Sequence, residues 1–161
     1  MTNVYQQLDG NTVATLQFVD NAGQPFVKDL KEELSFSEHT YNQDLMSQAP
    51  SYAWWSSVYV HAKQYLESSK LKLELVEADL GKHFRTVIEA EGKKPTKDMI
   101  TERIHTAPEY KEAREVNIWW ETRVLQLQYV VKALEQRNNA LTQFGAQMRS
   151  ETQSQNMRTG L

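Results

Sequence analysis

The sequence lacks cysteine, contains few glycines and prolines, and has no long hydrophobic run. Without cysteine it has no disulfide framework, no zinc ribbon and no thiol nucleophile. No stretch approaches the roughly 18 apolar residues that a membrane-spanning helix needs. The first ten residues lack the basic and apolar parts of a signal peptide. We therefore expect a cytoplasmic protein that does not enter a membrane.

Motifs that would indicate catalysis or cofactor binding are missing as well. There is no phosphate-binding Gly-rich loop and no Gly-x-Ser-x-Gly nucleophile elbow. The four histidines lack the spacing of metal ligands. The single Glu-x-x-His, at residues 102–105, has no second copy of the kind that a di-iron bundle requires. We expect no catalytic residue, no metal and no cofactor, and so a protein that is not an enzyme.

Charge is distributed unevenly along the 161 residues. Residues 1–50 contain two lysines and seven acidic side chains, a net charge of −5, whereas the whole chain has a net charge of −3. This part also holds a β-branched run, Thr12 to Val19, followed by a turn-like Asp20 to Gly23. We predict an acidic, irregular or strand-like arm over residues 1–27, a helical domain over residues 28–150 and a flexible polar tail over residues 151–161.

Two segments show the 3.5-residue repeat of a helix that packs against another helix along one stripe. The first begins near Pro50, whose missing N–H suits a first helical turn, and ends before Gly92. Its stripe is Trp55, Tyr59, Ala62, Leu66, Ser69, Leu73, Val76, Leu80, His83 and Val87. The second segment runs from Pro108 to Arg149. Its stripe is Val116, Trp120, Arg123, Leu127, Val130, Leu134, Arg137, Leu141, Phe144 and Met148.

Arg123 and Arg137 interrupt the second stripe, which a dry core tolerates poorly. In one interpretation they fix the register and oligomeric state, as polar residues at such positions do. In the other, neighbouring apolar residues rotate the stripe past them. Residues 28–49 predict a further helix, and Thr96 is placed to cap a short helix that ends near His105. The predicted fold class is all-α: a long antiparallel helical hairpin with a coiled-coil-like stripe, a short connecting helix, an extra N-terminal helix and the arm.

A basic cluster lies where the two long helices are joined. Residues 82–97 contain five basic and two acidic side chains, a net charge of +3 in a chain that is acidic overall. Lysine and arginine neutralise phosphates, and aromatic rings beside them stack on bases. The candidate DNA-binding residues are Lys82, Phe84, Arg85, Lys93, Lys94 and Lys97. The alternative is a charged loop that contacts only solvent.

The pairs Trp54–Trp55 and Trp119–Trp120 lie near the starts of the two long helices. Such pairs anchor cores or subunit interfaces more often than they stack on bases. An elongated helical protein also exposes much surface for its length and often completes its core by self-association. We therefore expect a homo-oligomer.

Several segments together resemble the UvsY-like family of phage recombination mediators. They are residues 30–34 (LKEEL), 52–55 (YAWW), 81–85 (GKHFR), 131–137 (VKALEQR) and 145–149 (GAQMR). The resemblance covers about three quarters of the chain. The sequence departs from the family pattern in the acidic arm before Lys28 and in the long connection from Lys93 to Pro108.

The resemblance implies a non-enzymatic homo-oligomer that binds single-stranded DNA. Such a protein loads a RecA-like recombinase onto strands coated with single-strand-binding protein, in the cytoplasm of the host cell if a phage encodes it. The family's basic element carries over to Lys82 and Arg85. Its assembly helix carries over to Leu134, Leu141, Phe144 and Met148.

Two alternatives from other classes remain. One is a helical structural or assembly protein of a phage particle that binds no nucleic acid. The other is a small adaptor protein that acts on a host partner through its acidic arm. Nucleic-acid binding at the basic cluster distinguishes the first hypothesis from both.

Overall fold

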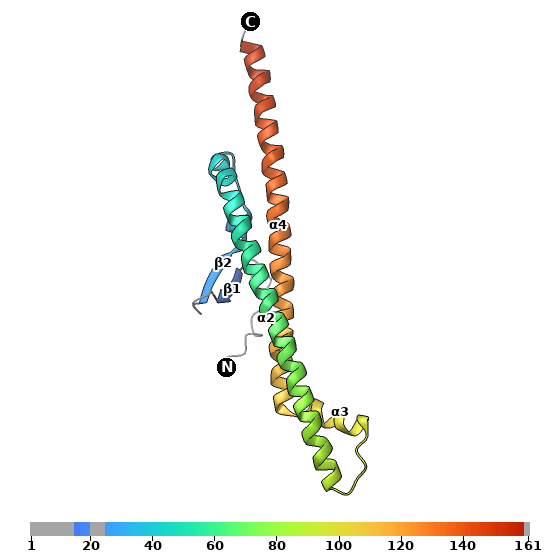
Figure 1. The fold of residues 1–161 in the computed structure, drawn as a ribbon. Helices are drawn as coiled ribbons and strands as arrows, with labels where there is room; N and C mark the ends of the chain where they lie inside the picture. The colour runs from blue at the N-terminus through green and yellow to red at the C-terminus, as the bar shows by residue number, and fades with distance from the viewer. Residues whose placement is uncertain (1–14, 20–24, 160–161) are drawn as a thin grey trace. The chain divides into compact units, whose positions relative to one another are not determined.

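The computed structural model describes residues 15–19 and 25–159. Its elements are β1 (Thr15–Val19), β2 (Pro25–Asp29), α1 (Leu30–Leu34), α2 (Tyr41–Ala90), α3 (Lys97–Thr106) and α4 (Pro108–Thr159), shown in Figure 1. The predicted all-α fold class is confirmed, since α2 and α4 pack against each other and α3 connects them.

The chain divides into two compact units. Unit 1 comprises Met1–Tyr52 and Lys132–Leu161, and unit 2 comprises Ala53–Val131. Each unit holds one antiparallel stretch of α2 and α4. The sequence-based division into arm, helical domain and tail stays a prediction.

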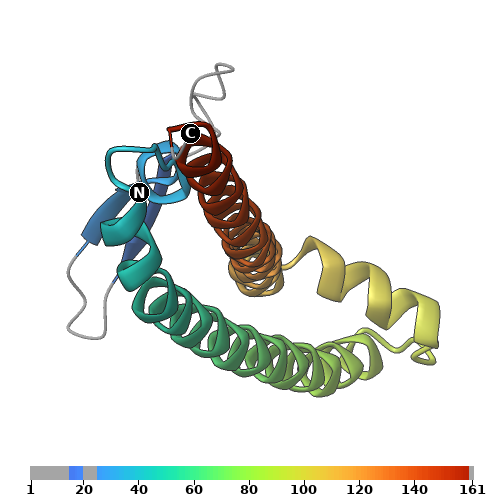
Figure 2. The ribbon, with the colours of Figure 1, turned by 90° about the horizontal axis from the view of Figure 1, so that it is seen from above.

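The described part of the arm is strand-like. β1 and β2 pair antiparallel, with Thr15 opposite Asp29 and Val19 opposite Pro25. Proline is tolerated at the first residue of a strand, where Pro25 stands. The predictions for residues 1–14 and 20–24 lie outside the described residues. Figure 2 shows the strand pair leading into α1 and, in unit 2, α3 between the end of α2 and the start of α4.

The helix predicted over residues 28–49 is interrupted. Asp29 caps α1 by accepting a hydrogen bond from the Lys31 N–H at 2.8 Å, but α1 ends at Leu34. In the following turn, the Ser37 and Thr40 hydroxyls each accept a hydrogen bond from the other residue's backbone N–H. Such side-chain bonds compete with a helix. The chain becomes helical again only at Tyr41.

Pro50 does not start the first long helix, so that prediction was wrong. α2 begins at Tyr41 and Pro50 lies inside it. Proline within a helix removes one backbone hydrogen bond and crowds the preceding turn. Contacts with α4 hold the helical turns before Pro50: the Tyr41 ring lies 5.5 Å from that of Phe144, and Gln48 donates to the Leu134 carbonyl at 2.8 Å.

The two stripes are partly shifted from their predicted positions. Trp55, Ala62, Leu66 and Ser69 are buried on α2, as are Leu127, Val130, Leu134, Arg137 and Leu141 on α4. At the far end of α2, however, His83 is exposed and Ile88 is buried. Likewise Val116 is exposed, and Asn117 takes its place in the interior. A helix of 3.6 residues per turn drifts by roughly 20° per heptad from a strict 3.5-residue repeat, which over the stretch from Trp55 to Ile88 accounts for the one-residue shift on α2 but not for that on α4.

A buried polar network lies in unit 1 around Arg137. Its Nη2 atom donates to Asp44 Oδ1 at 2.7 Å and to the Ser35 carbonyl at 3.2 Å, and its Nη1 donates to Gln48. The Arg137 side chain is only 6% exposed. A buried charge needs such a partner and such hydrogen bonds. Arg137 thereby ties the C-cap of α1 and the first turns of α2 to α4.

A smaller polar contact lies in unit 2. The Ser69 hydroxyl lies within donating distance of the Leu66 carbonyl, at 2.8 Å, and of Asn117 Oδ1, at 3.1 Å. Asn117 in turn donates from Nδ2 to Glu121 Oε1 at 2.7 Å. Both Ser69 and Asn117 are buried. The core of each unit therefore contains hydrogen-bonded polar side chains among its apolar residues.

α4 continues beyond its predicted end at Arg149 and remains helical to Thr159. Residues 149–157 are exposed. The flexibility that the sequence predicts for residues 151–161 stays a prediction.

Candidate nucleic-acid interface

The end of α2 is set by Gly92. This residue has a φ of 72°, in the left-handed region that glycine adopts without steric cost. The N–H of Gly92 donates to the Glu89 carbonyl, and that of Lys93 donates to the Ile88 carbonyl at 3.2 Å. This is a common way to end a helix, because it satisfies carbonyls of the last turn. Two lysines, Lys93 and Lys94, follow Gly92 directly in the sequence.

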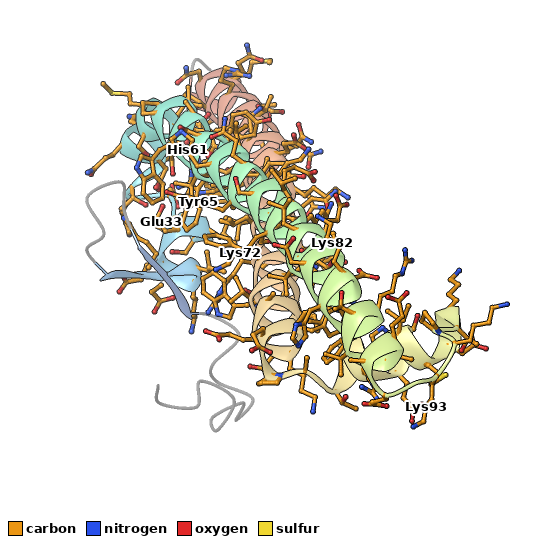
Figure 3. The ribbon with its side chains drawn as sticks, turned by 60° about the horizontal axis from the view of Figure 1, so that its bottom comes forward. Glu33, His61, Tyr65, Lys72, Lys82 and Lys93 are labelled. Carbon is orange, nitrogen blue, oxygen red and sulfur yellow. The ribbon has the colours of Figure 1, made fainter. Side chains whose placement is uncertain are left out.

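The tip cluster is defined here as Lys82, Arg85, Lys93, Lys94 and Lys97. All five side chains are exposed and belong to unit 2. Lys82 and Arg85 lie on α2, Lys93 and Lys94 follow its end, and Lys97 is the first residue of α3. The Lys82 side chain is 82% exposed and that of Lys93 is 61% exposed, and Figure 3 shows both. Each is accessible to an anionic ligand.

Phe84, the predicted stacking residue, differs from the basic ones. It is half-buried, and its ring makes an edge contact with His83, with ring centroids 5.3 Å apart. His83 is the more exposed of the two, although the sequence pattern placed it in the stripe. The structure therefore puts Phe84 partly toward the interior of unit 2.

Carboxylates lie close to three cations at this end of unit 2. Lys82 is 3.7 Å from Asp79, and Lys93 is 3.3 Å from Glu91. Arg103 of α3 donates from Nη2 to both oxygens of Glu91 at 2.9 Å. The hydrogen bond from Arg103, followed by that from Lys93, lowers the pKa of Glu91. The net charge of residues 82–97 does not include Arg103, because this residue lies on the next helix.

Ion pairs of this exposed kind contribute little to stability and are screened by salt. A cation in such a pair can therefore exchange its carboxylate for a phosphate at small cost. Arg85, Lys94 and Lys97 have no carboxylate within ion-pair distance in the part of the chain that the structure describes. The tip cluster thus combines cations that are unpaired with cations that are weakly paired.

No protein-family model, no curated protein and no solved structure matches the chain. Within residues 15–19 and 25–159, no helix contains a segment long and apolar enough to cross a lipid bilayer. The same residues contain no group of three or more side chains arranged to hold a metal ion.

The predicted assembly residues all lie in unit 1 and contact their own chain. Leu134 and Leu141 are fully buried. Phe144 is half-buried between the rings of Phe36, at 6.0 Å, and Tyr41, at 5.5 Å. Met148 is half-buried as well. Their role in assembly stays a prediction, and in this structure Leu134 and Leu141 offer no surface to a second copy.

Unit 1 also contains an open groove of about 420 Å³ between α2 and α4. Its lining residues are Leu45, Gln48, Ala49, Tyr52, Leu134, Glu135, Asn138 and Asn139. Tyr52 donates from its hydroxyl to Glu135 at 3.0 Å across one end of it. The lining contains one carboxylate and no cation, so the groove does not suit a phosphate.

The two tryptophan pairs have different surroundings within unit 2. Trp55 is fully buried in the core, one of the two roles that the sequence favoured for these pairs, while Trp54 is 41% exposed. Trp119 and Trp120 are both half-buried, and Trp120 stacks on Tyr65 of α2 with ring centroids 4.8 Å apart. The sequence did not predict a role for Tyr65, because this residue lies outside both predicted stripes.

Proposed function

We propose that this chain is a single-stranded DNA-binding recombination mediator. It helps to load a RecA-like recombinase onto single-stranded DNA during phage recombination and repair, as the UvsY-like resemblance implies. The observation that supports the proposal most is the tip cluster, where five exposed cations gather around the end of one helix. Phosphate contacts of this kind give binding without sequence preference.

The rest of the proposal follows from the same resemblance. The protein acts without catalysis, in the host cytoplasm, and has single-strand-binding protein and the recombinase as its partners. It works as a homo-oligomer, because the few phosphate contacts of one chain are weak and several chains together offer more of them. Linked sites raise avidity by roughly 10²–10⁴ when they engage one strand together.

The test is a titration of the full chain with single-stranded and duplex oligonucleotides at several salt concentrations. The double variant Lys82→Ala/Arg85→Ala should weaken single-strand binding for every sequence. Each lost phosphate contact flattens the slope of log affinity against log salt by about 0.7. Loss of both contacts therefore changes the slope by about 1.4, with no change in helix content.

A matched control removes two other exposed cations at the same spacing. Lys111 and Arg114 are exposed on α4 of the same unit, so Lys111→Ala/Arg114→Ala changes the net charge equally. This control should bind like the parent. Equal losses in both double variants would indicate only a general charge effect. If the tip variant binds like the parent at every salt concentration, the tip cluster is only a charged loop that contacts solvent. If the parent binds no single-stranded DNA, the proposal fails and a phage assembly protein or a host-directed adaptor takes its place.

The mediator role itself is tested with the recombinase. On DNA coated with single-strand-binding protein, the parent should shorten the lag before the recombinase begins to hydrolyse ATP. The tip variant should lose this effect, and the control variant should keep it. A parent that binds DNA but leaves the lag unchanged would be a DNA-binding protein without mediator function.

A further inference from the structure

Arg123 is a half-buried cation in unit 2 without an acidic partner. Its Nη1 atom donates to Gln126 Oε1 at 2.9 Å, and its guanidinium lies 5.0 Å from the centre of the Trp119 ring. No carboxylate lies within ion-pair distance of it in the described parts of the chain. Burial lowers the pKa of Arg123, which reflects the cost of removing its charge from water. An anion at this position would offset that cost.

Three aromatic rings continue from Arg123 across unit 2. The ring of Trp119 lies 4.7 Å from that of Trp120, edge to face. Trp120 in turn stacks on Tyr65 with an angle of 12° between the ring planes. Tyr65 is 55% exposed although it makes this contact. We name Tyr65, Trp119, Trp120 and Arg123 the aromatic strip.

The α2 side of the strip continues toward a further cation. Tyr65 is followed seven residues later by Lys72, and positions seven apart lie on nearly the same helix face. Figure 3 shows Tyr65 and Lys72 along one side of α2, with Lys82 on another side. Lys72 is exposed and has no ion-pair partner among the described residues. Cations thus flank the rings along two helices.

We propose that the aromatic strip is a second contact surface for single-stranded DNA, with bases stacked on Tyr65 and the tryptophans and a phosphate bound by Arg123. This inference rests on the proposed function and assigns the bases a site that the tip cluster lacks. Bases stack on aromatic side chains without sequence preference, and cations beside the rings follow the phosphates. A duplex keeps its bases stacked on one another, so the strip selects single strands.

The strip and the tip cluster therefore differ in what they recognise. The tip offers phosphates five cations and one half-buried ring, Phe84. The strip offers rings that contact one another and a cation without a carboxylate. Electrostatic contact accounts for salt sensitivity, whereas ring stacking accounts for preference over duplex DNA.

The test compares a labelled 20-nucleotide oligo(dT) with an abasic strand of the same length, using the full chain. Tyr65→Ala should weaken oligo(dT) binding about tenfold, because stacking of a base on one ring is worth roughly 5- to 150-fold in affinity. It should leave binding of the abasic strand unchanged. Arg123→Met should weaken binding of both strands and flatten the salt slope by about 0.7.

The control for Arg123→Met is Lys63→Met, which also removes one cation beside an aromatic ring. The Lys63 amine lies 5.5 Å from the centre of the Tyr59 ring, on α2 of the same unit. This variant should bind both strands like the parent. Circular dichroism of each variant reports whether the helices are intact.

If Tyr65→Ala is misfolded, quenching of tryptophan fluorescence in the parent tests the inference instead. Oligo(dT) should quench the emission and the abasic strand should not, and Trp119→Phe should reduce the quenching. The lack of a difference between the two strands would overturn the inference.

The tip variant Lys82→Ala/Arg85→Ala is measured beside the strip variants. If the tip variant loses affinity while Tyr65→Ala and Arg123→Met bind like the parent, the strip inference is wrong and the proposed function stands. If the parent binds no single-stranded DNA at low salt, both fail. If Arg123→Met loses binding to an acidic peptide but not to oligo(dT), the strip is a protein-binding surface and the inference is overturned.

Discussion

Arg137 in unit 1 and Arg123 in unit 2 occupy similar positions in the stripe of α4, yet their surroundings are opposite. Arg137 is bound to Asp44, Gln48 and the Ser35 carbonyl and is almost inaccessible to solvent. Arg123 is half-exposed, bonded to Gln126 and placed over Trp119. Both Nη atoms of the first arginine are bonded within its own chain. The second has guanidinium N–H groups without a hydrogen-bond partner among the described residues.

This difference shows that a cation in an apolar stripe has two distinct uses. A buried ion pair is costly to break because removal of one partner leaves the other charged and desolvated. A half-buried arginine can be removed without leaving such a group behind. The same residue type therefore serves structure in unit 1 and is available for binding in unit 2.

The largest predicted effect comes from breaking the unit 1 pair. Arg137→Met should lower the free energy of unfolding by about 3–5 kcal/mol, because Asp44 and Gln48 lose their partner inside unit 1. Arg123→Met should change it by no more than about 0.5 kcal/mol. Urea denaturation of both variants beside the parent measures this. Equal losses would mean that the two arginines have the same structural role.

Replacing Asp44 as well sharpens the comparison. In Arg137→Met/Asp44→Leu, neither charge is left without a partner, so part of the lost stability should return. A double variant that is less stable than Arg137→Met alone would show that Asp44 stabilises unit 1 without the arginine.

Two glycines provide the next comparison between the units. In unit 1, a Cβ on Gly145 would lie 2.0 Å from the Tyr41 hydroxyl and 2.9 Å from the ring carbon that bears it. In unit 2, a Cβ on Gly81 would lie 3.8 Å from Ile104, which is ordinary contact. Gly145→Ala should therefore cost about 1–3 kcal/mol, as overpacking does. Gly81→Ala should stabilise α2 by about 0.5–1 kcal/mol.

Thermal unfolding of the two glycine variants gives the sign of each effect. Tyr41→Leu combined with Gly145→Ala should recover part of the loss, because the clashing hydroxyl and ring carbon are gone. A stabilising Gly145→Ala would mean that Tyr41 moves aside freely.

The smallest effect concerns the exposed Glu91 pairs of unit 2. The pKa of Glu91 is lowered from its ordinary value of 4.5, first by the Arg103 hydrogen bond. A lowered pKa in the folded state gives stability that is present above the unfolded pKa and lost as the pH falls through the folded pKa. The parent should therefore be slightly more stable than Glu91→Gln at neutral pH, and this difference should vanish in acid.

High salt distinguishes this surface contribution from the buried pair. Salt screens exposed charges and affects buried ones much less. Adding salt should erase the difference between the parent and Glu91→Gln while the cost of Arg137→Met persists. Melting temperatures at low and high salt provide the measurement.

The sequence pattern predicted the structure correctly where residues close together in the sequence determine it. Thr96 caps α3 by accepting a hydrogen bond from Met99, and the stripe from Leu127 to Leu141 is buried as its spacing predicts. Pro50 misled because proline suits a first turn, whereas distant contacts of Tyr41 and Gln48 hold the preceding turns of α2 in place.

The candidate sites show the same division. Local composition predicted five exposed cations at the end of α2, and their exposure can be seen in the structure. The ion pairs near these cations were harder to predict, since Glu91 pairs with Arg103 of the following helix. The pairing of Arg137 with Asp44 joins residues 93 positions apart. The stacking of Tyr65 on Trp120 likewise depends on how two helices meet.

The contact between Ser69 and Asn117 discriminates against slippage of one helix along the other. A slip of one heptad would place Ser69 opposite Val124, whose side chain neither donates nor accepts a hydrogen bond. The amide of Asn117 would at the same time lose its hydroxyl partner. An unsatisfied buried polar group costs about 1–3 kcal/mol. One hydroxyl and one amide therefore favour the observed alignment over this shifted one.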